Sequence, residues 1–115
     1  MPELELVLDC ADKERLAGFW AEALGYRRRG AAGAYVALAP ADGQGPPLIL
    51  QQVAEPRLGK NRMHLDVKAD DIEAEAARLV ALGATRTRAE VVEEHGERWI
   101  VLADPEGNEL CVCQC

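Results

Sequence analysis

The sequence predicts an α+β fold in which one module, a strand, a helix and three further strands, occurs twice. The chain of 115 residues is 49% hydrophobic, enough for one globular domain that buries most of the surface its unfolded chain exposes. Two stretches share one pattern: "ELVLDCADKERLAGFWAEALGY" begins at Glu5, and "HLDVKADDIEAEAARLVALGAT" begins at His64. Each contains a short alternating strand, an acidic turn, an amphipathic helix and the stop "ALG", so we expect paired modules.

Both helices are predicted from their ends and from their apolar spacing. Asp12 and Asp71 precede the helices, where an acidic side chain can accept from free backbone N–H groups. Gly25 and Gly83 follow them, as glycine often does at a helix C-terminus. The residues expected to face a sheet recur at spacings of three and four: Leu16, Phe19, Trp20 and Leu24, then Ile72, Ala76, Leu79 and Leu82.

Strand-like segments follow each helix, separated by turn sequences. The expected strands are "AYVALA" and "PLILQQV" in the first half, and "TRTRAEVVEE", "RWIVLAD" and "NELCVCQ" in the second. "ADGQGPP", "EEHGE" and "DPEGN" are turn sequences, so His95 is read as a loop residue. Within one domain, 1–115, we expect module one at about 1–54, a linker at 55–60 and module two at about 61–115.

Charge and composition disfavour several classes of partner. The chain has 13 Lys plus Arg against 20 Asp plus Glu, a formal charge of −7, and its one basic stretch, "RRR" at 27–29, is read as a solvated turn. No apolar run is long enough to cross a bilayer, and the first residues lack a signal-peptide pattern. We therefore expect a cytoplasmic protein with reduced cysteines and no nucleic-acid or membrane partner. A cationic ligand or a bound metal suits the charge better.

The segment "KNRMHLDVKADD" alternates polar and apolar residues. As one strand, it would place Arg62, His64 and Asp66 on one face, and Met63, Leu65 and Val67 on the other, packed on helices. The polar face must then meet solvent, a partner or a ligand cavity.

Three stretches together resemble the vicinal oxygen chelate superfamily, of the glyoxalase, bleomycin resistance and dioxygenase type. They are "LDCADKERLAGFWAEALGY", "KNRMHLDVKADDIEAEAARLVALGAT" and "VLADPEGNELCV", and the resemblance covers nearly the whole chain. It implies two βαβββ modules in one chain, with curved mixed sheets around a cavity, and a homodimer. In metal-dependent members, His or Gln, Glu, His and Glu bind a divalent cation that also takes two neighbouring oxygens of the substrate.

The resemblance assigns a residue to each of the four ligand positions, but not all four residues are of the types that the family uses. Glu5 and His64 take the first and third positions, at equal spacing before the two helices. The turn "DPEGN" places the fourth on Cys111, where a glutamate is usual, and the second lies in "LILQQ", at Gln51 rather than Gln52. Cysteine is a soft ligand and an amide a weak one, so the expected cofactor is either none or a divalent metal, zinc before magnesium or manganese.

Two functions follow from this mixed set. The first is a small-molecule-binding glyoxalase-like protein with its ligand in an acidic cavity between the modules, with or without a metal, as in bleomycin-resistance-like proteins. The alternative is a metal-dependent lyase, isomerase or dioxygenase-like enzyme acting on adjacent oxygens, with a metal at Glu5 and His64. The catalytic candidates are His64 and Glu5, and the ligand-binding candidates are Gln51, Arg62, Asp66, Trp99 and Cys111.

Simpler readings of these residues stay open. His64 could line a cavity without a metal, Glu5 could belong to a half-exposed edge strand, and Trp99 could be core or pocket wall. In "CVCQC", Cys111, Cys113 and Cys115 would share one strand face, which we read as small apolar residues rather than a three-cysteine metal site.

Overall fold

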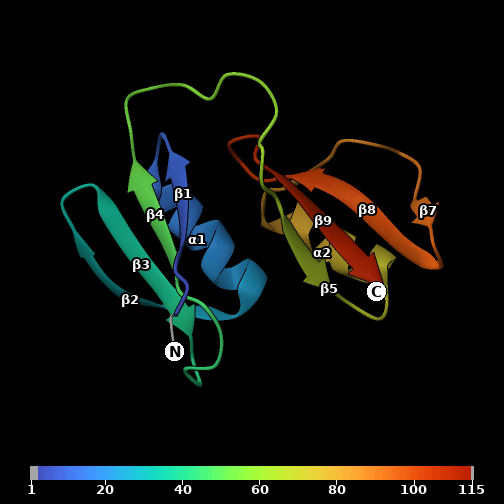
Figure 1. The fold of residues 1–115 in the computed structure, drawn as a ribbon, viewed down its shortest axis with the longest axis horizontal. Helices are drawn as coiled ribbons and strands as arrows, with labels where there is room; N and C mark the ends of the chain where they lie inside the picture. The colour runs from blue at the N-terminus through green and yellow to red at the C-terminus, as the bar shows by residue number, and fades with distance from the viewer. Residues whose placement is uncertain (1–2, 115) are drawn as a thin grey trace. The chain divides into compact units, whose positions relative to one another are not determined.

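The computed structural model describes residues 3–114, and its contacts divide the chain into two compact units with the boundary between Leu58 and Gly59. Each unit is a sheet with one helix (Figure 1). The first contains β1 (Leu6–Cys10), α1 (Lys13–Leu24), β2 (Tyr26–Ala32), β3 (Tyr35–Pro40) and β4 (Leu48–Gln52). The second contains β5 (Leu65–Lys68), α2 (Ile72–Leu82), β6 (Thr85–Arg86), β7 (Val92–Glu94), β8 (Glu97–Ala103) and β9 (Glu109–Gln114).

The two units share one topology, which confirms the α+β class and the two βαβββ modules. The first sheet has the order β1-β4-β3-β2, and the second has the order β5-β9-β8-β6, with β7 also paired to β8. In each sheet the first and last strands of the module pair in parallel, and the other pairs are antiparallel. The internal repeat in the sequence is therefore a repeat in structure.

The expected strand at 85–94 is divided into β6 and β7. Nε and Nη2 of Arg86 donate to the carbonyl oxygens of Arg88 and Ala89, at 3.1 and 3.0 Å. These bonds hold the intervening segment in a bend instead of a continuous ladder. The corresponding strand of the first unit, β2, is continuous but has a register shift between Arg28 and Gly30.

Both helix boundaries are as predicted. Oδ1 of Asp12 accepts from the backbone N–H of Arg15 at 3.1 Å, and Oδ1 of Asp71 accepts from that of Ala74 at 3.0 Å. Gly25 ends α1 in the left-handed region, with φ at 68°. These contacts satisfy backbone groups that a helix end otherwise leaves without partners.

The core lies between each helix and one face of its sheet. Leu16 and Trp20 in α1 and Leu79 in α2 are at most 1% exposed, as the apolar spacing predicted. Leu24 and Leu82, expected on the same faces, are only half-buried because they lie in the last turns. The buried sheet residues that complete the two cores are Val36, Leu38, Leu48, Leu50, Ile100, Leu102, Leu110 and Val112. Burying each such side chain contributes about 1.5–3 kcal/mol.

The basic stretch at 27–29 lies in β2 and is not a turn, which corrects the sequence-based interpretation. Arg28 forms an ion pair with Glu14 in the first turn of α1, with Nη2 and Oε2 at 3.0 Å. Arg86 and Glu73 form the matching pair in the second unit, with Nη1 and Oε1 at 2.8 Å. The guanidinium groups lower the pKa of both glutamates. The repeat therefore extends to the ion pairs that join helix and sheet.

Neither helix in residues 3–114 has the length and apolar character that spanning a bilayer requires.

Candidate functional site

The segment before β5 departs from the expected single strand. β5 begins only at Leu65, so Arg62, Met63 and His64 precede the ladder. Met63 is 70% exposed, and the prediction that it packs on a helix is wrong. The reason is that alternation governs side-chain direction only where backbone pairing holds the chain extended. Arg62 is likewise exposed.

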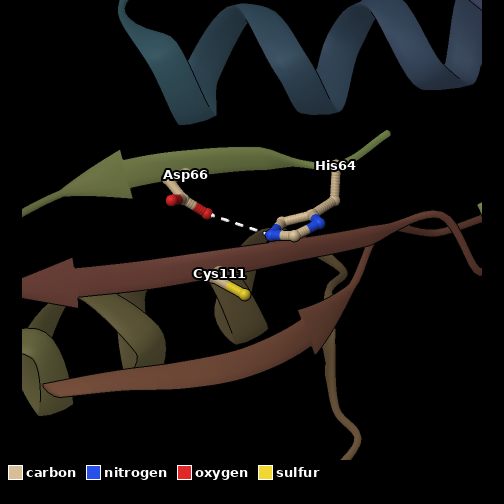
Figure 2. Close-up of side chains that lie close together, drawn as sticks. All are labelled: His64, Asp66 and Cys111. Carbon is tan, nitrogen blue, oxygen red and sulfur yellow. Dashed lines mark ion pairs between the residues drawn. The ribbon is translucent and has the colours of Figure 1, made fainter. Parts of the chain in front are cut away.

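His64, Asp66 and Cys111 come together on one face of the second sheet. Asp66 is directly opposite Cys111 in the parallel pairing of β5 with β9, so their side chains leave the sheet on the same side. His64 Nε2 lies 3.3 Å from Asp66 Oδ1. The three side chains offer a nitrogen, an oxygen and a sulfur atom within 4.8 Å of one another (Figure 2). Cys111 is 7% exposed, whereas the side chains of His64 and Asp66 are 44% and 51% exposed.

A buried carboxylate fixes the turn that leads into β9. Asp104 is 2% exposed, and its Oδ1 accepts from the backbone N–H groups of Glu106 and Asn108, both at 2.9 Å. The side-chain amide of Asn108 donates to Asp104 Oδ2, also at 2.9 Å. Because β9 begins at Glu109, these bonds determine which β9 residues face the cluster.

The segment that carries His64 is tied to the same turn. Lys60 Nζ lies 2.7 Å from each carboxylate oxygen of Glu109. Asn61 donates to Asn108 Oδ1 and accepts from the backbone N–H of Glu109, both at 3.4 Å. These contacts hold His64 beside β9, although it lies outside the ladder. The sequence-based prediction missed Lys60, Asn61 and Glu109; alternation from Cys111 could have placed Glu109 on the same face.

The Cys111 thiol is protonated at neutral pH. Burial, together with the negative charges of Asp66 and Glu109, raises its pKa from 9.0 to about 11, while the positive charge of Lys60 acts in the opposite direction. A pKa near that value leaves roughly one thiol in ten thousand ionised at pH 7. Cys111 can therefore become a ligand only if a metal displaces its proton.

In the first unit, the two glutamines of β4 point to opposite faces. Gln51 is half-buried and lies opposite Asp9 and Tyr35, on the face away from α1. Oε1 of Gln52 accepts from the backbone N–H of Lys13 at 3.2 Å, which places Gln52 on the helix side.

Strand pairing identifies the residue of the first unit that corresponds to Cys111, and this residue is not the Gln51 that the sequence suggested. The repeat matches Glu5 with His64, and therefore Val7 with Asp66. Asp66 pairs with Cys111, and Val7 pairs with Ile49. Ile49 is thus the structural counterpart of Cys111, and its side chain has no atom that can bind a metal.

Gln51 pairs with Asp9 and corresponds instead to Cys113, which pairs with Lys68. Glu5 is exposed and immediately precedes β1. The predicted four-ligand set takes Glu5 and Gln51 from the first unit and His64 and Cys111 from the second, and it stays a prediction.

The remaining candidates on the second sheet are placed by the β8–β9 register. Trp99 is half-buried and lies opposite Cys113, on the same face as Cys111. Cys10 and Cys111 are free thiols, whereas Cys113 is in a disulfide bond, so the expectation of reduced cysteines is wrong at Cys113. Cys115 lies outside the described residues.

The donor set fits a divalent metal. Imidazole nitrogen, carboxylate oxygen and thiolate sulfur are the ligands that zinc takes in proteins. His64, Asp66 and Cys111 could therefore hold a metal ion. Without one, His64 and Asp66 still offer hydrogen bonds and one negative charge to a ligand, above the apolar Cys111 thiol.

The chain is similar in sequence and fold to known proteins. A family model described as "glyoxalase-like domain" matches residues 5–113. A glyoxalase/bleomycin resistance protein/dioxygenase family enzyme from Burkholderia phytofirmans PsJN superposes with a TM-score of 0.80 at 15% identity, over 96% of this chain and 95% of that chain. A glyoxalase/bleomycin resistance protein from Albidiferax ferrireducens T118 gives 0.72 at 18% identity, over 96% of each chain.

A further structure, named oxidase ChaP-H2, gives a TM-score of 0.73 at 20% identity, over 100% of this chain and 94% of that chain. No curated protein matches the chain in sequence. At these identities the solved structures show a shared fold.

Proposed function

The chain belongs to the glyoxalase-like domain family, and from that premise we propose that it binds a small molecule through one sheet face of its second unit. We call this surface the His64 face and define it by His64, Asp66, Trp99, Glu109 and Cys111. One observation carries the proposal: a buried, protonated thiol, Cys111, stands where the family pattern expects a glutamate ligand. A protonated thiol is a poor ligand for magnesium or manganese, so we expect this face to bind its small molecule without either ion.

The charge and the aromatic side chain on this face favour a ligand with a cationic group and an apolar part. Asp66 is half-exposed, and its negative charge is available to a ligand, whereas Lys60 already neutralises Glu109. Trp99 presents an aromatic ring on the same face, which suits an apolar or cationic group. The acidic cavity between the modules, to which Glu5, Gln51 and Arg62 would contribute, remains part of this proposal, as does the homodimer.

A second candidate is a metal-dependent lyase, isomerase or dioxygenase-like enzyme. The convergence of His64, Asp66 and Cys111 favours it, and one structure of the same fold is named an oxidase. The nitrogen, oxygen and sulfur set suits zinc better than magnesium or manganese. A bound metal would supply Lewis-acid polarisation of adjacent substrate oxygens, and His64 and Glu5 are the residues we expect to hold it.

Ligand binding by chelator-treated protein tests the proposal. The probes are fragment-sized aromatic amines, each paired with its uncharged N-acetyl analogue, and binding is followed by calorimetry. We expect the amines to bind more tightly than their analogues, and Asp66→Asn to weaken amine binding about threefold to fivefold, because one half-exposed ion pair is lost.

Glu90→Gln is the matched control, because Glu90 is an exposed loop carboxylate away from β5 and β9. The proposal is wrong if no amine binds, if amines and N-acetyl analogues bind equally, or if Asp66→Asn has no more effect than Glu90→Gln.

A further inference from the structure

The family pattern builds its metal site from both modules, but the described residues concentrate suitable donors in one. Val7 and Ile49 stand in the first unit where Asp66 and Cys111 stand in the second. Neither apolar side chain can bind a metal. The two sheets therefore differ at this point in their capacity to bind a metal.

We propose that the second unit alone forms a site for a zinc-class divalent cation, with His64 Nε2, Asp66 and Cys111 Sγ as its three protein ligands. Asp66 is the new element, since the family pattern does not use this position. It supplies the carboxylate that the pattern expects at Cys111, from the neighbouring strand β5 instead of β9. The inference concerns the ion alone and stands independently of the small-molecule proposal.

The distances suit a tetrahedral ion. Zinc binds nitrogen and oxygen ligands at about 2.0–2.2 Å, so two such ligands of a tetrahedral site lie roughly 3.3–3.5 Å apart. His64 Nε2 and Asp66 Oδ1 are 3.3 Å apart. The Cys111 sulfur lies within 4.8 Å of both, close enough for side-chain rotation to complete the third position (Figure 2). The fourth position would stay open for water or a ligand.

The charges also balance. Asp66 and an ionised Cys111 supply two negative charges to a divalent cation, the same number as two glutamates would. Glu109 is engaged by Lys60 at 2.7 Å and is not needed. A set with one nitrogen, one oxygen and one sulfur selects zinc or cobalt over magnesium and manganese, which prefer oxygen ligands.

The backbone holds two of the three donors at fixed spacing. Asp66 and Cys111 are direct partners in the β5–β9 ladder, and the buried carboxylate of Asp104 fixes the turn into β9. Asn61 ties the segment before His64 to that turn. His64 is the least constrained donor, and the ion would order it.

The test is titration of the full chain, without a histidine tag and stripped with chelator, with Zn²⁺ in competition with a chromophoric chelator. We expect one zinc per chain. Asp66→Asn, His64→Ala and Cys111→Ser should each weaken zinc binding at least tenfold, since each removes one ligand. Glu90→Gln is the matched control and should change the affinity less than twofold. Glu5→Gln distinguishes this site from one that uses both modules.

Co²⁺ provides a readout of ligand identity. The cobalt-loaded chain should show a thiolate-to-metal absorption band that Cys111→Ser abolishes and Glu90→Gln leaves intact. The inference is overturned if zinc does not saturate at one site, or if Asp66→Asn binds as tightly as the unaltered chain. It is also overturned if Glu5→Gln weakens binding as strongly as Asp66→Asn, because that result assigns the ion to a site built from both modules. Amine binding by chelator-treated protein is measured separately, so either proposal can fail without the other.

Discussion

Replacing Asp66 with asparagine should lower the pKa of the Cys111 thiol and speed its alkylation. Asp66 lies opposite Cys111 across the β5–β9 ladder, and its negative charge disfavours a thiolate on the same face. Asparagine keeps the size of the side chain and removes the charge. Access of reagent to the thiol should therefore stay the same while the thiolate becomes easier to form.

The size of the effect follows from the separation of the two groups. Their donor atoms lie within 4.8 Å. Two unit charges at that distance repel by about 0.9 kcal/mol in water, and by about 3.5 kcal/mol at an effective dielectric constant near 20. The half-exposed Asp66 side chain favours the lower figure. Burial, the larger cause of the raised pKa, remains in the variant, so we expect a decrease of roughly 0.5–1 pKa unit from about 11.

Site-resolved mass spectrometry after timed iodoacetamide labelling measures this change in chelator-treated protein. Below the thiol pKa the rate follows the thiolate fraction, so Asp66→Asn should label Cys111 about threefold to tenfold faster. Cys10 provides an internal control, because its thiol donates to the Gln51 carbonyl oxygen in the first unit. An unchanged or slower rate at Cys111 would refute the electrostatic argument, and an equal change at Cys10 would point to general loosening instead.

Three further predictions follow from the same contacts. The raised pKa of Cys111 should lower the free energy of unfolding by about 1–2 kcal/mol between roughly pH 9 and 11, because the thiol ionises at a lower pH in the unfolded chain than in the folded one. Urea unfolding of the unaltered chain and of Cys111→Ser measures this loss as a difference in pH dependence. An equal pH dependence in both proteins would contradict the prediction. Asp104→Ala should lower the free energy of unfolding by about 2–4 kcal/mol, because buried turn groups lose their partner, whereas Asp42→Ala in an exposed turn should cost less than about 1 kcal/mol. Cys111→Glu should raise manganese affinity in calorimetry, because it adds an oxygen ligand directly opposite Asp66 in the β5–β9 ladder, and no gain would contradict a shared ion at these two positions.

The local features of the fold could be predicted because their causes lie within a few residues. Asp12 and Asp71 cap helices that begin just after them, and Gly25 supplies the left-handed backbone at the end of α1. Trp20 is buried because helical spacing places it with other apolar residues. The prediction that the turn "DPEGN" is followed by a strand carrying Cys111 is confirmed.

The errors arose where pairing between distant strands decides the outcome. Alternation predicted that Met63 packs inward, but β5 begins two residues later and Met63 is exposed. The choice of Gln51 was made without strand pairing and stays a prediction, whereas the pairing of β1 with β4 makes Ile49 the structural counterpart of Cys111. The approach of Asp66 to Cys111 likewise depends on the β5–β9 register, which joins residues 45 positions apart.

The two units share the contacts that stabilise each module and differ where we propose that a metal binds. Each unit has an aspartate that caps its helix, and each joins its helix to the next strand through a glutamate–arginine pair. Those contacts act within one unit, so each copy needs its own. Asp66 and Cys111 have the apolar counterparts Val7 and Ile49. A single ligand or ion would need only one complete set of donors, which agrees with the proposal. This asymmetry between the two sheets, more than any one residue, supports our proposal that the His64 face is the functional surface of the chain.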